Sequence, residues 1–363
     1  MNTRVLVTGA TGFVAGHVIV ELLDHGYAVR GTVRDLADTG KRAHLAEYAT
    51  RVGGDLEFVA ADLNADDGWS EAVSDCTQVL HVASPFPSAP PDNEGELIRT
   101  AVDGTLRVLR AAADAPAVRR VVLTSSIAAI AHGHLDDGIR TEADWTVVER
   151  SPAYQRSKTL AERAAWEFAE SLPTVRGLEL VVVNPGMVLG PLLAPETSTS
   201  HEPVRRLLAG AVPGSPRVGW SVVDVRDLAV AHRLALETAG AAGNRYICAG
   251  EHVWMQDMAR VLAAEYGPRG FRIATRALPS PLVRLVAVFD RGLRLTVPAL
   301  GKIERVSAAR AHRELGWTMR PVGVTVRDTA ESLLRERIVP LPGKVASAPD
   351  GRRVPRDRGM RSA

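Results

Sequence analysis

A glycine-rich turn near the N-terminus constrains the fold more than any other feature of this chain. In the stretch "RVLVTGATGFVAGHVIVELLDHGY", an apolar strand-like run leads into the turn and an amphipathic run follows it. Gly9 permits a tight turn, and Gly12 permits the backbone to approach a pyrophosphate that the N–H groups of the next helix would face. Ala15 stands where a third glycine is usual, and alanine is an accepted substitute there. The stretch therefore predicts a strand–turn–helix unit that holds a dinucleotide.

Strand-like and helix-like segments alternate through the first half of the chain. The strand-like segments are "RVLVTG", "YAVRGTV", "LEFVAA", "QVLHVAS", "RRVVLTSS" and "LELVVVNP". Several are apolar nearly throughout, as is typical of strands covered on both faces. Amphipathic helices are predicted around residues 13–25, 40–50, 94–115 and 151–172. This alternation predicts an α/β fold, a Rossmann-type doubly wound parallel sheet with a smaller, mixed C-terminal substrate-binding region.

Composition changes along the chain predict its division. We expect a dinucleotide-binding domain over residues 1–185, to which about 218–240 returns, and a substrate-binding region over 186–335. Residues 340–363 hold six Lys/Arg and two Asp/Glu, a charge of +4, so the remainder of the +2 chain carries −2. This Pro/Gly/Arg-rich tail is predicted to be disordered. Because it lacks interleaved aromatic residues, nucleic acid is not an expected partner.

Membrane, secretion and metal signals are not found in the sequence. No apolar run approaches the roughly 18 residues of a membrane span, and no secretion signal is recognised, so a cytoplasmic protein without a membrane partner is expected. Cys76 and Cys248 have no partner spacing for a metal or a disulfide framework. His132 and His134 in "AHGHLDD" are interpreted as parts of a loop, so no metal is predicted.

The end of the second strand predicts which dinucleotide is bound. Folds that bind NAD usually place Asp or Glu about 20 residues after the glycine turn, whereas Val33 occupies that place here and Arg34 follows it. A guanidinium binds a 2′-phosphate bidentately, and Lys41 adds a second charge, although Asp35 acts in the opposite sense. NADP(H) is therefore predicted rather than NAD(H). Asp62 is expected either to accept a hydrogen bond from the adenine amino group or to cap its own loop.

A tyrosine and a lysine one helical turn apart predict the chemistry. In "SPAYQRSKTLAE", Tyr154 and Lys158 follow a helix-start signal and have neighbouring side chains. The preceding strand ends in "TSS", which places Ser125 and Ser126 at the sheet edge where ligands bind. Tyr154 would protonate an alkoxide as a hydride reaches a carbonyl, and Lys158 would lower the pKa of the phenol from its usual value of about 10. A serine hydroxyl would polarise the substrate oxygen.

Together these stretches resemble the extended short-chain dehydrogenase/reductases of the NAD-dependent epimerase/dehydratase superfamily. Within it the chain is similar to the dihydroflavonol reductase, cinnamoyl-CoA reductase and microbial aldehyde/ketone reductase group. The matching stretches, within about residues 4–317, are "VTGATGFVAGHV", "GTVRD", "HVASP", "VVLTSS", "TEADW", "YQRSKTLAERAAWEFA", "NPGMVLGP", "VDVRDLA" and "AHRELGW". The resemblance implies that Ser126, Tyr154 and Lys158 form the catalytic triad.

The same resemblance implies the residues that bind the cofactor. Tyr154 and Lys158 also belong to this set. The others are Gly9, Gly12, Phe13 and Val14 at the pyrophosphate, Arg34 and Lys41 at the 2′-phosphate, Asp62 and Leu63 at the adenine, Val82, Ala83 and Ser84 beneath the cofactor, and Pro185, Gly186 and Val188 beside the nicotinamide.

Two positions depart from the plant members of that group. Ala131 replaces the asparagine of dihydroflavonol reductases, and "SPAYQRSK" lacks the tryptophan of cinnamoyl-CoA reductases. These departures argue against dihydroflavonol and CoA-thioester substrates. A hydroxysteroid dehydrogenase or a sugar-nucleotide epimerase on the same scaffold remains an alternative. A non-catalytic NADP-sensing protein is a third reading, although such sensors usually lose the Tyr or Lys that this chain keeps.

The segment after Pro185 is expected to close the substrate pocket. Its apolar candidates are Leu192, Leu193, Val212, Trp220, Trp254, Leu282, Val286 and Phe289. The apolar run at 280–300 is expected to pack over the pocket rather than lie on a membrane. We expect an NADP(H)-dependent oxidoreductase, monomer or homodimer, for a medium-sized and mostly apolar aldehyde, ketone or alcohol. A nucleotide-sugar would instead need a phosphate clamp, for which Arg205 and Arg206 are the adjacent pair.

Overall fold

Seven parallel strands form the central sheet of the computed structural model, which describes residues 3–85, 93–289, 294 and 297–342. In spatial order the strands are β3 (Leu56–Ala60), β2 (Ala28–Val33), β1 (Arg4–Val7), β4 (Gln78–His81), β5 (Arg120–Thr124), β6 (Glu179–Pro185) and β10 (Arg245–Cys248). The strand order reverses between β1 and β4, which is where such sheets bind ligands. The predicted doubly wound parallel sheet is confirmed.

Helices cover both faces of this sheet. One layer consists of α1 (Phe13–Asp24), α2 (Ala43–Val52), α7 (Val225–Glu237) and α11 (Ala309–Leu315), and the other of α3 (Trp69–Val73), α4 (Glu94–Asp114) and α5 (Ala153–Ser171). Along β1, Val5 and Val7 pack into the first layer, while Leu6 packs into the second. This alternation explains why the strands are apolar on both faces.

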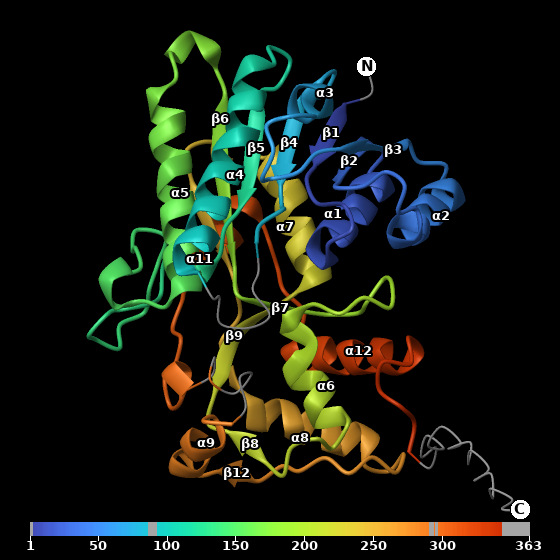
Figure 1. Cartoon of the computed structure of the whole chain (residues 1–363), viewed down its shortest axis with the longest axis vertical. Coiled ribbons are helices and arrows are strands. Elements are labelled where there is room, and N and C mark those ends of the chain that lie inside the picture. The colour runs from blue at the N-terminus through green and yellow to red at the C-terminus, as the bar shows by residue number, and fades with distance from the viewer. Residues whose placement is uncertain (1–2, 86–92, 290–293, 295–296, 343–363) are drawn as a thin grey trace, which may run out of the picture.

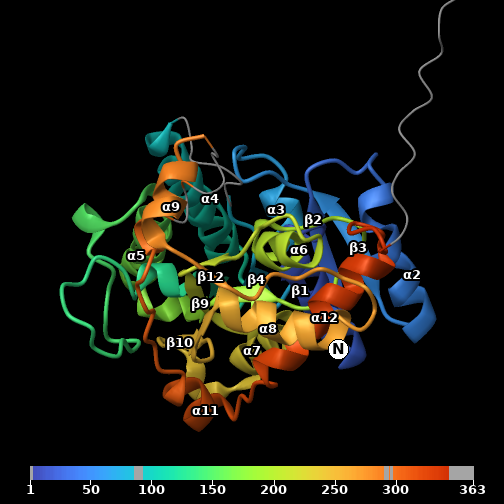
Figure 2. The same cartoon turned by 90° about the horizontal axis from the view of Figure 1, so that it is seen from below.

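A smaller C-terminal region lies below the carboxyl ends of the strands (Figure 1). Its strands are β7 (Met187–Leu189), β9 (Gly219–Asp224) and β11 (His252–Trp254) in one sheet, and β8 (Ser215–Pro216) and β12 (Ala277–Leu278) in another. Its helices are α6 (Glu202–Leu208), α8 (Met255–Tyr266), α9 (Ser280–Val286) and α12 (Val322–Arg335). Across both regions of the described chain, short 3-10 turns occupy Gly40–Arg42, Ile127–Ala129, Val148–Arg150, Thr174–Arg176, Thr199–His201, Ala239–Ala241 and Val297–Ala299. Figure 2 shows α8 and α12 beneath the sheet, where they share an apolar core with α6.

The chain passes between the two regions more than once. Within residues 218–240, β9 pairs with β7 and β11 of the smaller sheet, and α7 packs against α1. The chain then re-enters the central sheet as β10, which pairs with β6. Residues from both regions therefore meet at the carboxyl edge of the sheet.

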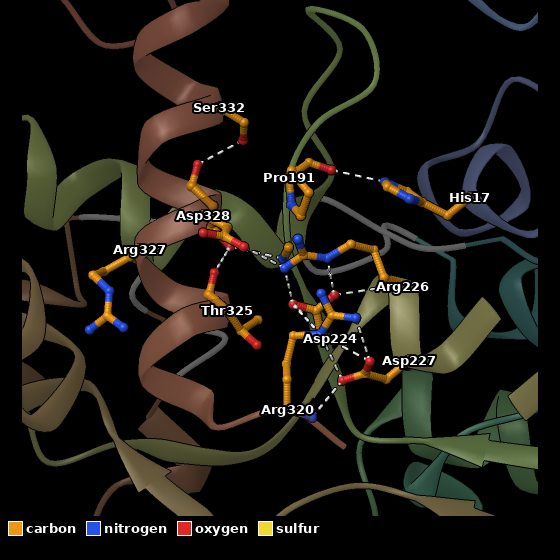
Figure 3. A network of polar contacts seen from close by, with 12 residues as sticks. His17, Pro191, Asp224, Arg226, Asp227, Arg320, Thr325, Arg327, Asp328 and Ser332 are labelled. Atoms are coloured by element: carbon orange, nitrogen blue, oxygen red, sulfur yellow. Dashed lines mark hydrogen bonds and ion pairs between the residues drawn. The ribbon is translucent and has the colours of Figure 1, made fainter. Parts of the chain in front are cut away.

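An ion-pair network fastens α7 to α12 (Figure 3). Asp224 caps α7 by accepting a hydrogen bond from the Arg226 backbone N–H at 2.9 Å. The Arg226 guanidinium binds Asp224 and also reaches Asp328 of α12 at 2.6 Å. Arg320, just before α12, binds Asp227 at 2.6 Å. Charged hydrogen bonds of this kind fix the C-terminal region against the sheet layer.

The structure describes part of two C-terminal segments, the apolar run at 280–300 and the basic tail. The apolar run at 280–300 begins with α9, whose Leu282 and Leu285 side chains are exposed. The predicted basic tail lies outside the described residues from 343 onward. Within the described ranges, no helix is both long and apolar enough to cross a membrane.

Candidate active site

The glycine turn after β1 is packed closely against the end of β4. Gly9 has a φ of +71°, and a Cβ added there would lie 3.0 Å from the Ala83 Cβ. Its N–H donates to Thr32 Oγ1 at 2.9 Å. Thr8 Oγ1 accepts hydrogen bonds from the N–H groups of Val82 and Ala83 at 3.0 and 2.9 Å. Only glycine fits this turn without strain, and the turn is fixed at the point where the strand order reverses.

The start of α1 can receive an anion. The N-cap residue of α1 is Gly12, and in the described chain no side chain caps this helix start. The first turn of the helix holds no acidic residue. A cavity of about 230 Å³ lies over this helix start. Its lining residues are Thr11, Gly12, Phe13, Gly16, His44, Leu192, Leu193, Ala194, Glu196, Thr197 and Ser198. A Pro191 carbonyl 2.9 Å from His17 Nε2 holds the covering loop to α1. Uncapped N–H groups beneath a cavity fit the pyrophosphate of a dinucleotide.

Two cations lie near the end of β2. Arg34 is exposed directly after the strand, and Lys41 forms an ion pair with Asp38 at 2.9 Å. The Asp38 hydrogen bond raises the pKa of Lys41, whereas the charge of Arg34 lowers it, so the two cations are close enough to interact. Asp35 accepts a hydrogen bond from a backbone N–H in its own turn at 2.7 Å. The charge arrangement fits the 2′-phosphate of NADP(H).

Residues near the predicted adenine site take part in a loop contact. Asp62 Oδ1 accepts hydrogen bonds from the backbone N–H of Asn64 at 2.9 Å and from its side-chain Nδ2 at 3.2 Å. Leu63 follows and contacts Gly104 of α4, where an added Cβ would lie 3.0 Å from the Leu63 Cβ. The contact at Asp62 is of the loop-capping type, one of the two roles expected for this carboxylate.

The structure brings Ser126, Tyr154 and Lys158 together. Ser126 follows β5, and its hydroxyl hydrogen-bonds Tyr154 at the start of α5. The same hydroxyl accepts from the Ala128 N–H at 3.1 Å and faces the Pro185 carbonyl at 3.5 Å. Lys158 lies one turn along α5 from Tyr154 and is 8% exposed. A phenol, a hydroxyl and an ammonium therefore share one edge of the sheet.

The turn between β6 and β7, which holds the residues expected beside the nicotinamide, is equally close-packed. At Gly186 an added Cβ would lie 2.0 Å from the Ser221 carbonyl oxygen, so only glycine fits between β6 and β7. The Gly186 N–H donates to the Cys248 carbonyl of β10 at 3.1 Å. Val188 lies on β7, which pairs with β9. The chain thus passes from the central sheet into the C-terminal region at Pro185, Gly186 and Val188.

Burial controls the protonation of the site. Desolvation raises the pKa of Tyr154 to about 12, and the Ser126 hydrogen bond acts against that shift. Desolvation lowers the pKa of Lys158 to about 8, and the charge of Glu162 acts against that shift. The sequence led us to expect a Tyr154 pKa below 10, but loss of hydration raises it, and the Ser126 hydrogen bond offsets only part of that rise. At neutral pH Tyr154 is therefore a phenol with a proton to donate, and Lys158 is mostly charged.

A buried polar network next to this site was not predicted from the sequence. Glu162, one turn beyond Lys158, is 0% exposed. Its carboxylate accepts hydrogen bonds from Ser125 Oγ at 2.5 Å, Asn184 Nδ2 at 2.8 Å and Arg245 Nε at 2.5 Å. The i, i+4 spacing from Lys158 was an available signal for Glu162. Nothing local indicated Arg245, which lies 83 residues away in the chain.

The apolar residues expected at the substrate pocket occupy varied places. Leu192 is in the buried core, and it lines the cavity over α1 together with Leu193. The Trp254 ring is covered by the Arg217 guanidinium, 4.6 Å from its centroid. Leu282 and Phe289 are 47% and 85% exposed. These five residues do not form one shared wall, because apolar character alone does not distinguish core, lining and surface.

Arg205, Arg206 and the two histidines of "AHGHLDD" have partners within the described chain. Glu202 binds both Arg205 and Arg206 at 2.7 Å. His132 Nε2 lies 3.6 Å from Glu304, whose pKa burial raises to about 7. His134 Nε2 hydrogen-bonds the Ile130 carbonyl at 2.8 Å. The two histidines of "AHGHLDD" therefore contact different groups.

Comparisons with known proteins agree on one family. A model of the NAD dependent epimerase/dehydratase family matches residues 5–249. A cinnamoyl-CoA reductase of Medicago truncatula is 35% identical over 94% of this chain and 98% of its own length. An anthocyanidin reductase of Vitis vinifera is 35% identical over 72% of this chain and 80% of its own length.

Solved structures give the same result. The yeast methylglyoxal/isovaleraldehyde reductase, complexed with NADPH, superposes with a TM-score of 0.76 and 28% identity, over 92% of this chain and 99% of that one. Vestitone reductase from alfalfa gives a TM-score of 0.71 and 26% identity over 92% and 99%. The similarity therefore extends from the sheet into the C-terminal region.

Proposed function

The chain belongs to the NAD dependent epimerase/dehydratase family and is an oxidoreductase that uses NADP(H), and from this premise we propose that it reduces a medium-sized, mostly apolar aldehyde or ketone to its alcohol. The observation that carries the proposal is the contact between Ser126 and Tyr154, with Lys158 one turn away. Relatives and structural neighbours that are named reductases support the same reaction class.

Each of the three residues has a part in the proposed reaction. When bound, NADPH supplies a hydride to the carbonyl carbon. Tyr154 donates its phenolic proton to the carbonyl oxygen, so the C=O double bond becomes a CH–OH group. Ser126 donates a hydrogen bond to the same oxygen and polarises it. Lys158, charged at neutral pH, stabilises the tyrosinate left after proton transfer and holds the nicotinamide ribose.

The preference for NADPH is assigned to the end of β2. Arg34 stands where a carboxylate would repel a 2′-phosphate, and Lys41 lies close enough to feel its charge. The cavity over Gly12 and Phe13 would take the pyrophosphate. These contacts would hold the adenosine and pyrophosphate parts of the cofactor on one side of the strand-order reversal, with Tyr154 on the other side.

A nucleotide-sugar substrate is disfavoured by the charges of the C-terminal region. Arg205 and Arg206 are the adjacent cations that such a diphosphate would need, and Glu202 binds both. Ion-paired guanidiniums have less charge available for a phosphate than free ones. Small carbonyl compounds impose no such requirement.

A substrate panel tests the proposal. Aromatic aldehydes, alicyclic ketones, ketoesters, steroids, a cinnamoyl-CoA thioester and UDP-sugars are compared by loss of NADPH absorbance and by product analysis. The proposal expects the highest specificity constant for an apolar aldehyde or ketone. A higher specificity constant for a UDP-sugar or for the CoA thioester would contradict the substrate class, and NADPH turnover with none of them would contradict the function.

A further inference from the structure

A fully buried carboxylate lies next to the proposed catalytic residues. Glu162 and Lys158 occupy the same face of α5 and are 0% and 8% exposed. Three donors contact the Glu162 carboxylate: the Ser125 hydroxyl, the Asn184 amide and the Arg245 guanidinium. Donors alone satisfy a carboxylate in its ionised form, because the ionised group only accepts hydrogen bonds. A buried charge of this kind is costly unless it is paired in this way.

The guanidinium that binds Glu162 is itself fixed from the other side. Arg245 lies 3.8 Å from the centroid of the Trp145 ring. Its NH1 donates to the backbone carbonyls of Glu142 and Asp144 at 2.9 and 2.8 Å. The position of the Glu162 carboxylate is therefore determined by the last strand of the sheet and by the loop over residues 141–145.

The network also reaches the serine side of the site. Asn184 Nδ2 donates to Glu162 and to the backbone carbonyl of Ser126, at 2.8 and 3.2 Å. Ser125, the residue before Ser126, donates to the same carboxylate oxygen. One carboxylate thus connects the helix that carries Tyr154 and Lys158 with the strand ends that carry Ser126.

The charged groups around Lys158 are few. Glu162 attracts it along α5, and Tyr154 is one turn before it. His81, at the end of β4, is neutral at neutral pH because burial lowers its pKa to about 3. Helix α4 packs along α5 and buries uncharged side chains only. Among the described residues, Glu162 is the anion whose charge raises the pKa of Lys158 against the lowering by burial. Arg245 is the cation that binds the same Glu162 carboxylate.

We propose that Glu162 is a positioning residue, whose carboxylate keeps Lys158 charged and fixes the Tyr154–Lys158 turn of α5 against the ends of β5, β6 and β10. This role rests on the proposed function, since it concerns the same site. Glu162 touches none of the reacting atoms and acts through Lys158. Arg245 and Ser125 hold the carboxylate in place.

A direct titration of Lys158 tests this role without turnover. The chain holds only four lysines, at positions 41, 158, 302 and 344. The full-length protein labelled with ¹³C at the lysine ε-carbon therefore gives few signals, and Lys158→Arg identifies the one of interest. In the wild type this signal should titrate near pH 8.

Glu162→Gln should move the Lys158 midpoint down by about one to two pH units. A unit charge roughly 6 Å away at an effective dielectric constant near 20 has an effect of about this size. Loosened packing would act in the opposite direction, because rehydration raises the midpoint of a buried lysine. A lower midpoint thus supports the charge role, and an unchanged or higher midpoint overturns it.

A second variant keeps the test decisive if Glu162→Gln does not fold. Glu162→Met combined with Arg245→Met replaces the buried pair by apolar groups, a change that proteins often tolerate. Its Lys158 midpoint should also fall, by less, because a competing cation is removed with the anion. An unchanged or higher midpoint in this folded variant overturns the proposal.

A matched control uses a similar pair on the same sheet. Glu179 binds the nearly buried Arg120 at 2.6 Å, between the starts of β5 and β6. Glu179→Gln should leave the Lys158 midpoint within about 0.2 pH units of the wild type, and an equal shift there would overturn a specific role for Glu162. In turnover assays, the alkaline limb of NADPH-dependent reduction should shift with the titration. Absence of reduction in the wild type would contradict the proposed function alone, since the titration does not depend on it.

Discussion

Replacing Arg34 with alanine should convert an NADPH-selective site into one that binds NADPH and NADH more equally. Arg34 is exposed at the end of β2, so its charged hydrogen bond to a 2′-phosphate belongs to the lower part of the usual range, about 1.5–2 kcal/mol. Since 1.4 kcal/mol corresponds to a factor of ten, the dissociation constant for NADPH should rise about 10- to 30-fold. Lys41 remains in Arg34→Ala and prevents a larger loss.

The assay is a fluorescence titration of the full chain with NADPH and with NADH at about 0.1 M salt. The dissociation constant for NADH, which lacks the 2′-phosphate, should change by less than about twofold. Arg51→Ala is the matched control, because Arg51 lies over the Tyr48 ring of the neighbouring helix α2. Equal weakening of NADPH and NADH in Arg34→Ala would refute the assignment of the 2′-phosphate to Arg34. At about 1 M salt the loss should shrink, because exposed charges are screened.

Three further predictions concern stability. Gly9→Ala should lower the free energy of unfolding by about 1–2 kcal/mol and weaken NADPH binding. Gly53→Ala, at a glycine with a similar positive φ but open surroundings, should leave NADPH binding unchanged. Equal effects of the two variants on NADPH binding would contradict the packing argument. Burial lowers the pKa of His232 to about 4, so the folded state binds fewer protons than the unfolded chain between about pH 6.5 and 4. The free energy of unfolding should therefore fall on acidification by up to about 1.4 kcal/mol per pH unit for this group. If His232→Gln leaves the dependence of stability on acid pH unaltered, this prediction is contradicted. Asp224→Ala should lower the free energy of unfolding in urea by at least about 2 kcal/mol, because it removes both a helix cap and a buried charge partner. Asp328→Ala, at the exposed end of the network, should lower it by less than about 1 kcal/mol. A reversed order would be evidence against the network in Figure 3.

The fold was predictable from the sequence because its signals are local. Apolar strands that alternate with amphipathic helices determine a doubly wound sheet through the rules of handedness and burial. The turn at Gly9 and the spacing of Tyr154 and Lys158 are likewise encoded within a few residues. The structure adds that the positive φ of Gly9 is combined with close packing against Ala83.

The environment of the site was less predictable, because it depends on contacts between distant segments. The side chain of Arg245 pairs with Glu162 only after β10 has joined β6, and no pattern around Arg245 indicates this. The pKa of Tyr154 was expected to fall, but it rises because desolvation depends on the packed surroundings. Leu192 and Phe289 are both apolar, yet one is buried in the core and the other is exposed.

The measurement that tests the account most directly compares the wild type with Tyr154→Phe in NADPH-dependent reduction of the best aldehyde or ketone of the panel. The account predicts a fall in turnover of at least about a hundredfold, the scale expected when a positioned acid is lost. NADPH should bind with a dissociation constant within about threefold of the wild type, because Arg34 and the glycine turn are intact. Turnover near the wild-type rate in Tyr154→Phe, with NADPH bound normally, would contradict the assignment of Tyr154 as the proton donor.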